Sequence, residues 1–172
     1  SASGGKEDSE ETFRRMGCLQ AILNHRVPGR WTLTQCMGQG ASGIVVKATD
    51  TIRQEVAVKL VMPQQEGEQF GKADSRRLRR EAQAMMRVQD PHVCAAFDSF
   101  FFPNDHHPLA FVLILEAVNG PTLAHRLSSA SQMSELDVAC VCTDILRGLK
   151  AVHAAGLVHR DLKPENICTT VR

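Results

Sequence analysis

The sequence has no strong excess of charge of either sign. Its 172 residues carry 20 lysines and arginines against 19 aspartates and glutamates, which leaves a formal net charge of +1 at pH 7. A protein that binds nucleic acid over a broad surface needs a basic excess that neutralises phosphates. The charge balance therefore argues against nucleic acid as a partner of this chain.

Long hydrophobic runs are also absent. The longest clean apolar run, Leu109 to Leu115, is far shorter than the ~20 residues that a membrane-spanning helix requires. The first residues, S-A-S-G-G-K-E-D-S-E-E, are polar and do not form a signal peptide. We therefore expect no membrane partner and an intracellular location, in the cytoplasm or the nucleus.

The six cysteines lack the spacing of a metal site. No C-x-x-C pair occurs among them, and no histidines stand at a matching distance. We therefore expect no zinc site, and cysteines that are small buried apolar residues in a reducing compartment. They are Cys18, Cys36, Cys94, Cys140, Cys142 and Cys168.

The first part of the chain, residues 1–30, is predicted to be a disordered start followed by a helix. Residues Ser1 to Glu11 are small, polar and acidic, a composition that favours disorder. From Thr12 to about Asn24, apolar residues recur at near-helical spacing until Pro28 and Gly29 break the pattern. We expect this helix to cap the body of the protein.

A glycine-rich segment follows a predicted strand, Trp31 to Met37. It has the sequence Gly38-Gln39-Gly40-Ala41-Ser42-Gly43, and this spacing alone fits a plain β-turn or a dinucleotide site equally well. A dinucleotide site, as in a Rossmann dehydrogenase, needs a helix that begins inside the glycines, whereas Ile44-Val45-Val46 favour a second strand. The pattern therefore predicts a glycine hairpin whose backbone amides can approach phosphate oxygens.

Two charged residues stand in apolar surroundings. Lys59 lies in the middle of a predicted strand, Glu55 to Met62, and must either extend its ammonium to water or meet an anion. Glu81 lies on the apolar stripe of a predicted helix, Ser75 to Gln89, where a carboxylate needs a cationic partner. Arg77, four residues earlier, offers a local ion pair, and Lys59 offers a functional one.

Further strands and an internal boundary follow. The segments Val93 to Phe102 and Leu109 to Glu116 are predicted to be strands joined by a polar loop. Asn119-Gly120-Pro121 then ends the strand region, because glycine and proline interrupt regular structure. We therefore expect the chain to divide near residue 119.

A long helix is predicted to begin after Ser134. Asp137, three residues later, completes a capping box, and Gly156 suits the C-terminal cap. Apolar residues cover most of the circumference of this helix, which is typical of a helix with neighbours on several sides. The residues that follow offer no further helix to cover it, so we expect a partner to cover its exposed part.

The densest group of polar side chains lies in the predicted loop Val158 to Asn166, V-H-R-D-L-K-P-E-N. Gly38 to Val45 matches G-x-G-x-x-G-x-V, Val56 to Lys59 matches V-A-I-K with one valine for isoleucine, and His159 to Asn166 matches H-R-D-L-x-x-x-N. With the three motifs in this order, the chain from about Trp31 onward closely resembles the protein kinase family.

The resemblance implies an α+β fold. A five-stranded antiparallel N-lobe sheet with one αC-type helix is expected over residues 31–118, which also include the hinge. Residues 119–172 would form the first helices of a mainly helical C-lobe that ends just after the catalytic loop.

The resemblance also implies a site for ATP. The glycine hairpin would cover the phosphates, and Lys59 would hold the α- and β-phosphates while paired with Glu81. Apolar side chains would contact the adenine and gate the back of the pocket, and the hinge would bind adenine through its backbone. The implied nucleotide-binding residues are Gly38, Gly40, Gly43, Val45, Ala57, Lys59, Leu115, Glu116 and Val118.

The catalytic residues implied by the resemblance lie in the polar loop. Asp161 would accept the proton of a protein hydroxyl, and Asn166 would bind Mg²⁺. Lys163, two residues after Asp161, resembles the serine/threonine-directed branch, in which it steadies the transferred phosphate. The substrate would therefore be a protein that presents serine or threonine.

The 172 residues depart from the family pattern after Asn166. The D-F-G metal-binding segment should follow, and the remaining residues read Ile167-Cys168-Thr169-Thr170-Val171-Arg172. Since the D-F-G aspartate is a main magnesium ligand, we expect weak or no kinase activity from these residues alone. The alternative is a truncated nucleotide-binding or regulatory module without catalysis.

Overall fold

A computed structural model describes residues 4–40, 43–63, 65, 67–129 and 133–170. The chain divides into two compact units. The first unit comprises residues 1–82 and 96–117, and the second comprises residues 83–95 and 118–172. None of the helices in the described part of the chain combines the length and the apolar character that a membrane crossing requires.

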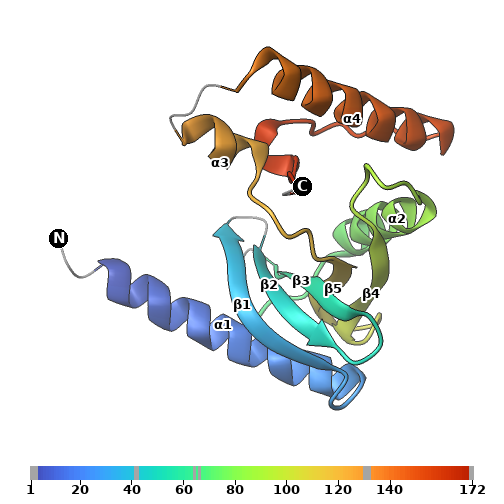
Figure 1. Ribbon diagram of the computed structural model, residues 1–172. Coiled ribbons are helices and arrows are strands. Elements are labelled where there is room, and N and C mark those ends of the chain that lie inside the picture. Colours follow the sequence, from blue (N-terminus) through green and yellow to red (C-terminus); the bar gives the residue numbers. More distant parts are fainter. Residues whose placement is uncertain (1–3, 41–42, 64, 66, 130–132, 171–172) are drawn as a thin grey trace. The chain divides into compact units, whose positions relative to one another are not determined.

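The first unit is built on a five-stranded antiparallel sheet with the order β1-β2-β3-β5-β4 (Figure 1). This sheet confirms the predicted α+β fold, and the tight β1–β2 connection confirms the glycine hairpin. Helix α2 (Lys72–Arg87) lies between β3 and β4 in sequence. The strands are β1 (Trp31–Gly40), β2 (Gly43–Asp50), β3 (Gln54–Val61), β4 (Ala96–Pro103) and β5 (Pro108–Glu116).

One face of the sheet forms the core of the first unit. In β3, Val56, Val58 and Leu60 are at most 1% exposed, and the register places Val58 between Val46 of β2 and Ile114 of β5. Residues of opposite faces alternate along a strand, so this burial fixes which residues of β2, β3 and β5 lie on the other face.

Helix α1 (Gly4–Arg26) completes this core and corrects one expectation. The helix begins at Gly4, so the predicted disorder is wrong from Gly4 to Glu11, while residues 1–3 lie outside the described residues. Its buried residues Leu19, Ile22 and Leu23 join the core. Acidic residues near a helix N-terminus are stabilised by the helix dipole, and a packed helix propagates readily from its anchored turns. The acidic composition therefore extended the helix.

A buried carboxylate fastens the start of β1 to the end of β2. Asp50 is 2% exposed and accepts hydrogen bonds from the Trp31 indole (3.0 Å), the Ile52 amide (2.8 Å) and the Arg30 guanidinium (3.3 and 3.4 Å). Burial raises the pKa of Asp50, but the Ile52 amide, Arg30 and Trp31 together outweigh it and leave this pKa below its ordinary value.

We expect Asp50→Asn to lower the free energy of unfolding by about 1–3 kcal/mol at pH 7, because its buried partners lose their anion. A lowered folded-state pKa contributes stability above the unfolded pKa of about 3.9, and that stability is lost as pH falls through the folded pKa. The difference in the free energy of unfolding between parent and variant, measured by urea denaturation, should therefore become smaller below about pH 4.

Glu68→Gln is the matched control for this experiment, because Glu68 is an exposed acid of the same unit. Its effect at pH 7 should stay within about 0.5 kcal/mol. If the loss of unfolding free energy caused by Asp50→Asn did not change with pH, a stabilising role for the Asp50 charge would be contradicted.

The second unit contains helix α3 (Leu123–Ser128), helix α4 (Glu135–Ala154) and the 3-10 turn η1 (Pro164–Asn166). The predicted capping box of α4 is confirmed, with reciprocal hydrogen bonds between Ser134 and Asp137. Its C-terminus is also confirmed: Gly156 has a φ of 72°, and its amide donates to the His153 carbonyl at 2.9 Å.

Much of α4 has no cover in the structure. Its buried residues are Gly148 and Val152, whereas Leu136 and Leu146 are 74% and 65% exposed. Cys140 and Cys142 lie on this uncovered part of α4 and are exposed, so the expectation that they are buried is wrong. Cys36 is half-buried, and the remaining three cysteines are also exposed.

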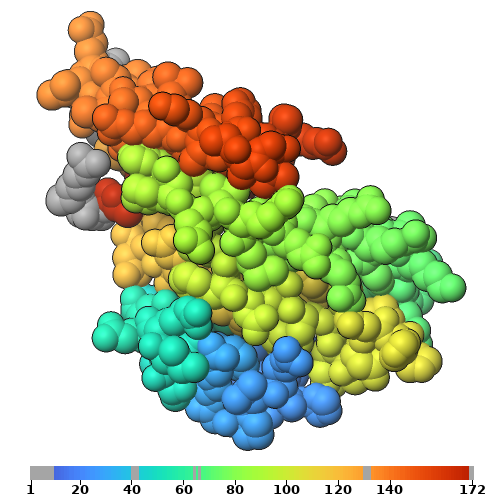
Figure 2. All heavy atoms as spheres, turned by 90° about the vertical axis from the view of Figure 1, so that its right-hand side faces the viewer, coloured from blue at the N-terminus to red at the C-terminus, as the bar shows by residue number. Residues whose placement is uncertain are grey.

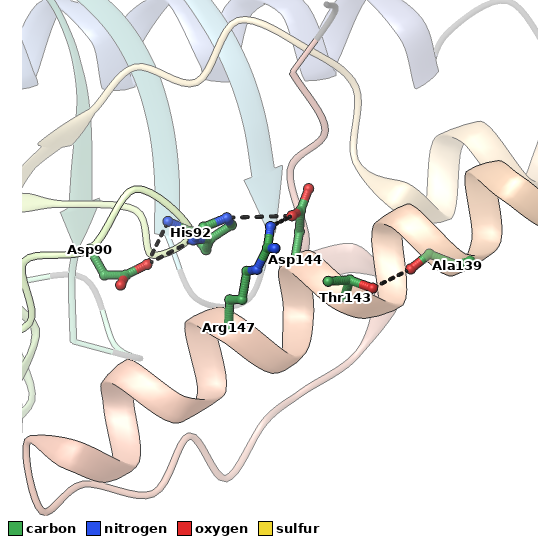
Figure 3. A network of polar contacts seen from close by, with 6 residues as sticks. All are labelled: Asp90, His92, Ala139, Thr143, Asp144 and Arg147. Atoms are coloured by element: carbon green, nitrogen blue, oxygen red, sulfur yellow. Dashed lines mark hydrogen bonds and ion pairs between the residues drawn. The ribbon is translucent and has the colours of Figure 1, made fainter.

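The turn that follows α2 packs against α4 within the second unit (Figure 2). Figure 3 shows His92 between two carboxylates, with Nδ1 at 3.0 Å from Asp90 and Nε2 at 3.4 Å from Asp144 of α4. Arg147 contacts the same Asp144 oxygen at 3.3 Å. At Gly148 an added Cβ would lie 2.7 Å from the His92 carbonyl oxygen, so the absence of a side chain permits this contact.

We expect Gly148→Ala to destabilise the protein, although alanine is the better helix former, because the new methyl meets backbone that must shift. The expected loss is about 1–3 kcal/mol in the free energy of unfolding. Gly17→Ala in α1 is the matched control, since nothing lies within 4 Å of its added Cβ. The control should gain about 0.5–1 kcal/mol. Stabilisation by both substitutions would contradict the close contact at Gly148.

Candidate functional site

The glycine hairpin joins β1 to β2, with Gly38 opposite Val45 and the two glycines Gly40 and Gly43 opposite each other. Gly43 has a φ of 111°, and a Cβ at this position would overlap the Leu60 carbonyl oxygen of β3. Both observations require glycine at the end of the G-x-G-x-x-G segment. Residues 41 and 42, at the predicted hairpin tip, lie outside the described residues.

The predicted nucleotide residues of the three central strands share one face of the sheet, opposite the core. The register pairs Val45 of β2 with Lys59 of β3, and Ala57 of β3 with Leu115 of β5. Since residues paired across strands point to the same side, these four side chains form one patch beside the glycine hairpin. Lys59 is the charged member of these four residues, and Lys47, which lies opposite Ala57 on the same face, pairs with Glu55 at 2.7 Å.

Lys59 is half-buried at the centre of this patch. Among the described residues, its ammonium forms no ion pair or side-chain hydrogen bond. A cation on an apolar face, held by a strand that is paired on both sides, can attract an anion.

The predicted pair between Lys59 and Glu81 is not formed in this structure, although both are described residues of the first unit. Glu81 instead contacts Arg77 at 3.6 Å, and its side chain is 58% exposed. The buried residues of α2 are Leu78 and Ala82, so Glu81 lies beside the buried stripe rather than within it. An exposed carboxylate satisfies its charge with the cation one helical turn away at little desolvation cost.

The predicted hinge, Glu116 to Val118, connects the two units along the chain. Glu116 is the last residue of β5 and has an exposed side chain. Val118 is the first residue of the second unit in this part of the chain and is half-buried, and its carbonyl accepts a hydrogen bond from Gly120 at 3.2 Å.

The predicted catalytic loop brings its three functional residues together. The Lys163 ammonium lies 3.0 Å from Oδ2 of Asp161, and the Asn166 side-chain amide donates to the same oxygen at 2.8 Å. The Asn166 amide also donates to the Asp161 backbone carbonyl at 2.9 Å. Arg160, with a φ of 65°, occupies the left-handed region that turns the loop.

The surroundings of Asp161 favour its charged form. The hydrogen bond from the Lys163 side chain is the largest influence that lowers the pKa of Asp161, followed by the hydrogen bond from Asn166. Its carboxylate is therefore ionised at neutral pH, with both contacts on one oxygen.

The segment after the loop is tied to the start of α3, a contact that the sequence analysis missed. The Leu123 amide donates to the Ile167 carbonyl at 2.7 Å, and the amide and hydroxyl of Thr169 donate to the Pro121 carbonyl at 2.9 and 2.8 Å. A Cβ at Gly120 would overlap the Thr169 carbonyl oxygen. Gly120 is the sequence signal for this close contact, although the pattern Asn119-Gly120-Pro121 by itself predicts only a boundary in the chain.

The loop has ligand atoms that suit magnesium. Asn166 uses its amide nitrogen on Asp161, which leaves its carbonyl oxygen, a hard ligand of the kind that Mg²⁺ takes. No group of three or more His, Cys, Asp or Glu side chains suited to a metal occurs within the described ranges. Magnesium commonly takes one or two protein ligands together with phosphates and water, so the residues fit a magnesium–nucleotide complex.

Comparison with known protein families decides the relationship. The model of the protein kinase domain matches residues 31–171, which include the whole sheet, the predicted hinge and the predicted catalytic loop. The chain belongs to the protein kinase family. The predicted resemblance is therefore confirmed, and helix α1 precedes the matched segment.

Proteins similar to this chain include protein kinases of several kinds. A probable serine/threonine-protein kinase, pknA2 of Bifidobacterium longum, is 30% identical over 82% of this chain and 18% of its own length. The DNA damage response protein kinase DUN1 of Saccharomyces cerevisiae is 29% identical over 83% of this chain and 27% of its own. The mitogen-activated protein kinase HOG1 of Torulaspora delbrueckii is 34% identical over 92% of this chain and 35% of its own. The chain thus spans roughly a fifth to a third of these relatives.

We expect Lys163→Met to raise the pKa of Asp161 toward the ordinary aspartate range, because the substitution removes the main stabilising charge. Asn166→Ala should raise this pKa as well. Carbon-13 NMR of the Asp161 carboxyl, followed through an acid titration, measures the change. Arg147→Met, which removes a cation of α4, is the control that should leave the Asp161 titration unchanged. An unshifted midpoint in Lys163→Met would contradict the contact.

Proposed function

We propose that this chain forms the ATP-binding and phosphoryl-transfer part of a serine/threonine protein kinase. The observation that carries the proposal is the convergence of Lys163 and Asn166 on one oxygen of Asp161. The match to the protein kinase domain and the similarity to a probable serine/threonine-protein kinase and to mitogen-activated protein kinases support the same activity. Because the chain spans only part of those relatives, the activity of the whole protein and its protein substrate belong to the proposal.

In this proposal Asp161 orients the attacking hydroxyl of serine or threonine. A carboxylate with a lowered pKa is a weak base, so it accepts the hydroxyl proton late, as the new P–O bond forms. Lys163 is close enough to Asp161 to place positive charge beside the transferred phosphate. Asn166 would contribute its carbonyl oxygen to Mg²⁺, which supplies neutralisation of phosphate charge when it is bound.

The nucleotide would occupy the patch on the first unit. Val45, Ala57 and Leu115 offer apolar contact for adenine, and backbone atoms of Glu116 to Val118 offer hydrogen bonds to it. Lys59 would hold the phosphates beneath the glycine hairpin. In this proposal, the Lys59–Glu81 ion pair would form in a second conformation of the first unit, in which Glu81 leaves Arg77 and contacts Lys59 instead.

Nucleotide binding is tested by calorimetry of the 172-residue chain with MgATP. Lys59→Met should weaken the affinity about 10- to 100-fold, since a charge-assisted hydrogen bond contributes ~1.5–3 kcal/mol. Lys72→Met removes an exposed lysine of α2 and should leave the affinity unchanged. Equal affinities of parent and Lys59→Met would overturn the assignment, and tight NADH binding would favour the dehydrogenase alternative.

Phosphoryl transfer is tested with a protein substrate rich in serine and threonine and radiolabelled ATP. The 172 residues contain no D-F-G segment, so we expect the purified chain alone to give little or no transfer. Robust transfer that Asp161→Asn abolishes would contradict this expectation and would confirm the catalytic role of Asp161.

A second candidate is a nucleotide-binding or interaction module without catalysis. The observation that favours it is the exposure of Leu136, Val138 and Leu146, which are 74%, 45% and 65% exposed on α4. Exposed apolar patches of this kind are typical of interaction sites. Binding of a hydrophobic dye that falls in Leu146→Glu would support this candidate, and the absence of dye binding would count against it.

A further inference from the structure

Helix α1 lies outside the segment that matches the protein kinase domain, yet it is part of the same core. The match begins at Trp31, and α1 ends at Arg26. Leu19 and Leu23 are fully buried, and Ile22 is 3% exposed, in one cluster with the central strands of the sheet. Removal of α1 would therefore expose one face of the sheet, so the helix has a fixed place in the first unit.

The position of α1 along β1 is set by one glutamine. The Gln20 side chain donates to the Trp31 carbonyl at 2.9 Å and accepts from the Leu33 amide at 3.0 Å. A side-chain amide that uses both its donor and its acceptor on one strand determines the register of the helix against that strand. β1 is an edge strand of the described sheet, and backbone groups on the outer side of an edge strand have no neighbouring strand to pair with. The Gln20 side chain supplies hydrogen-bond partners for two backbone groups of β1, the Trp31 carbonyl and the Leu33 amide.

A second contact joins α1 to the glycine hairpin. The Thr12 hydroxyl donates to Oε1 of Gln39 at 2.8 Å. Gln39 stands between Gly38 and Gly40, which have no side chains. Its exposed side chain is therefore the one through which residues 38–40 can contact α1. Gln39 is paired with Ile44 of β2, and the contact from α1 adds a side-chain restraint at this glycine-rich end of β1, where the backbone has high intrinsic conformational freedom.

We propose that α1 restrains the glycine hairpin through the Thr12–Gln39 hydrogen bond, so that Thr12 acts as a positioning residue for the segment that covers the nucleotide. The restraint itself depends only on the contacts of the first unit. Its effect on nucleotide affinity rests on the proposed function. A hairpin held near its bound conformation loses less freedom when a nucleotide arrives, and the affinity is correspondingly higher.

Hydrogen–deuterium exchange of the full chain, without nucleotide, tests the restraint. In Thr12→Val, which keeps the side-chain shape, peptides covering residues 36–46 should exchange about two- to fivefold faster than in the parent, as expected when the exposed Thr12–Gln39 hydrogen bond is lost. Thr12→Ser keeps the hydroxyl and should restore the parent rate. Peptides from β3 and β5 should be unchanged.

Thr143→Val is the matched control, because the Thr143 hydroxyl donates to the Ala139 carbonyl of its own helix at 2.7 Å (Figure 3). It should leave the hairpin exchange at the parent rate. Equal hairpin exchange in Thr12→Val and the parent would overturn the proposal, as would equal acceleration throughout the first unit, which indicates a purely structural role. A failure of Thr12→Ser to restore the rate would also overturn it.

Calorimetry with MgATP separates this inference from the proposed function. If the parent binds MgATP, Thr12→Val should weaken the affinity about two- to fivefold and Thr12→Ser should not. If the parent does not bind MgATP, the proposed function fails, while the exchange experiment still decides whether α1 restrains the hairpin. Unchanged affinity in Thr12→Val, with the parent binding, would overturn the coupling to the nucleotide.

Discussion

Burial of one face of β3 is the constraint on which the first unit depends. Val56, Val58 and Leu60 must be covered, and the neighbouring strands and α1 cover them. Because side chains alternate along a strand, this burial places Ala57 and Lys59 on the opposite face. Lys59 therefore owes its position to the packing of residues that have no chemical role. A shift of the register by one residue would bury its charge and expose the valines.

Much of the fold and part of the site could be predicted from the sequence, because both rest on local patterns. Alternation identified the strands, the Ser134–Asp137 capping box identified the start of α4, and a glycine that can adopt a positive φ, Gly156, identified its end. The clustering of polar side chains in the loop Val158 to Asn166 was predictable for the same reason, since Lys163 and Asn166 lie within five residues of Asp161 and both contact it in one short turn.

Contacts between distant segments could not be predicted in this way. The sequence offered Glu81 two cations, and the choice of Arg77 depends on an exposure that helical spacing alone does not determine. The close approach of Gly120 to Thr169 depends on where the chain returns after the loop. The polar and acidic composition of Ser1 to Glu11 favours disorder when it is taken alone, but the buried leucines downstream stabilise a helix that extends back to Gly4.

The two carboxylate oxygens of Asp161 differ in their contacts. Lys163 and Asn166 both contact Oδ2, so among the described residues neither side-chain contact of this carboxylate involves Oδ1. Two side chains contact Oδ2, so the two otherwise equivalent oxygens of this carboxylate have different surroundings. Under the proposed function, Oδ1 is the oxygen that would accept the hydrogen bond of an incoming serine or threonine hydroxyl.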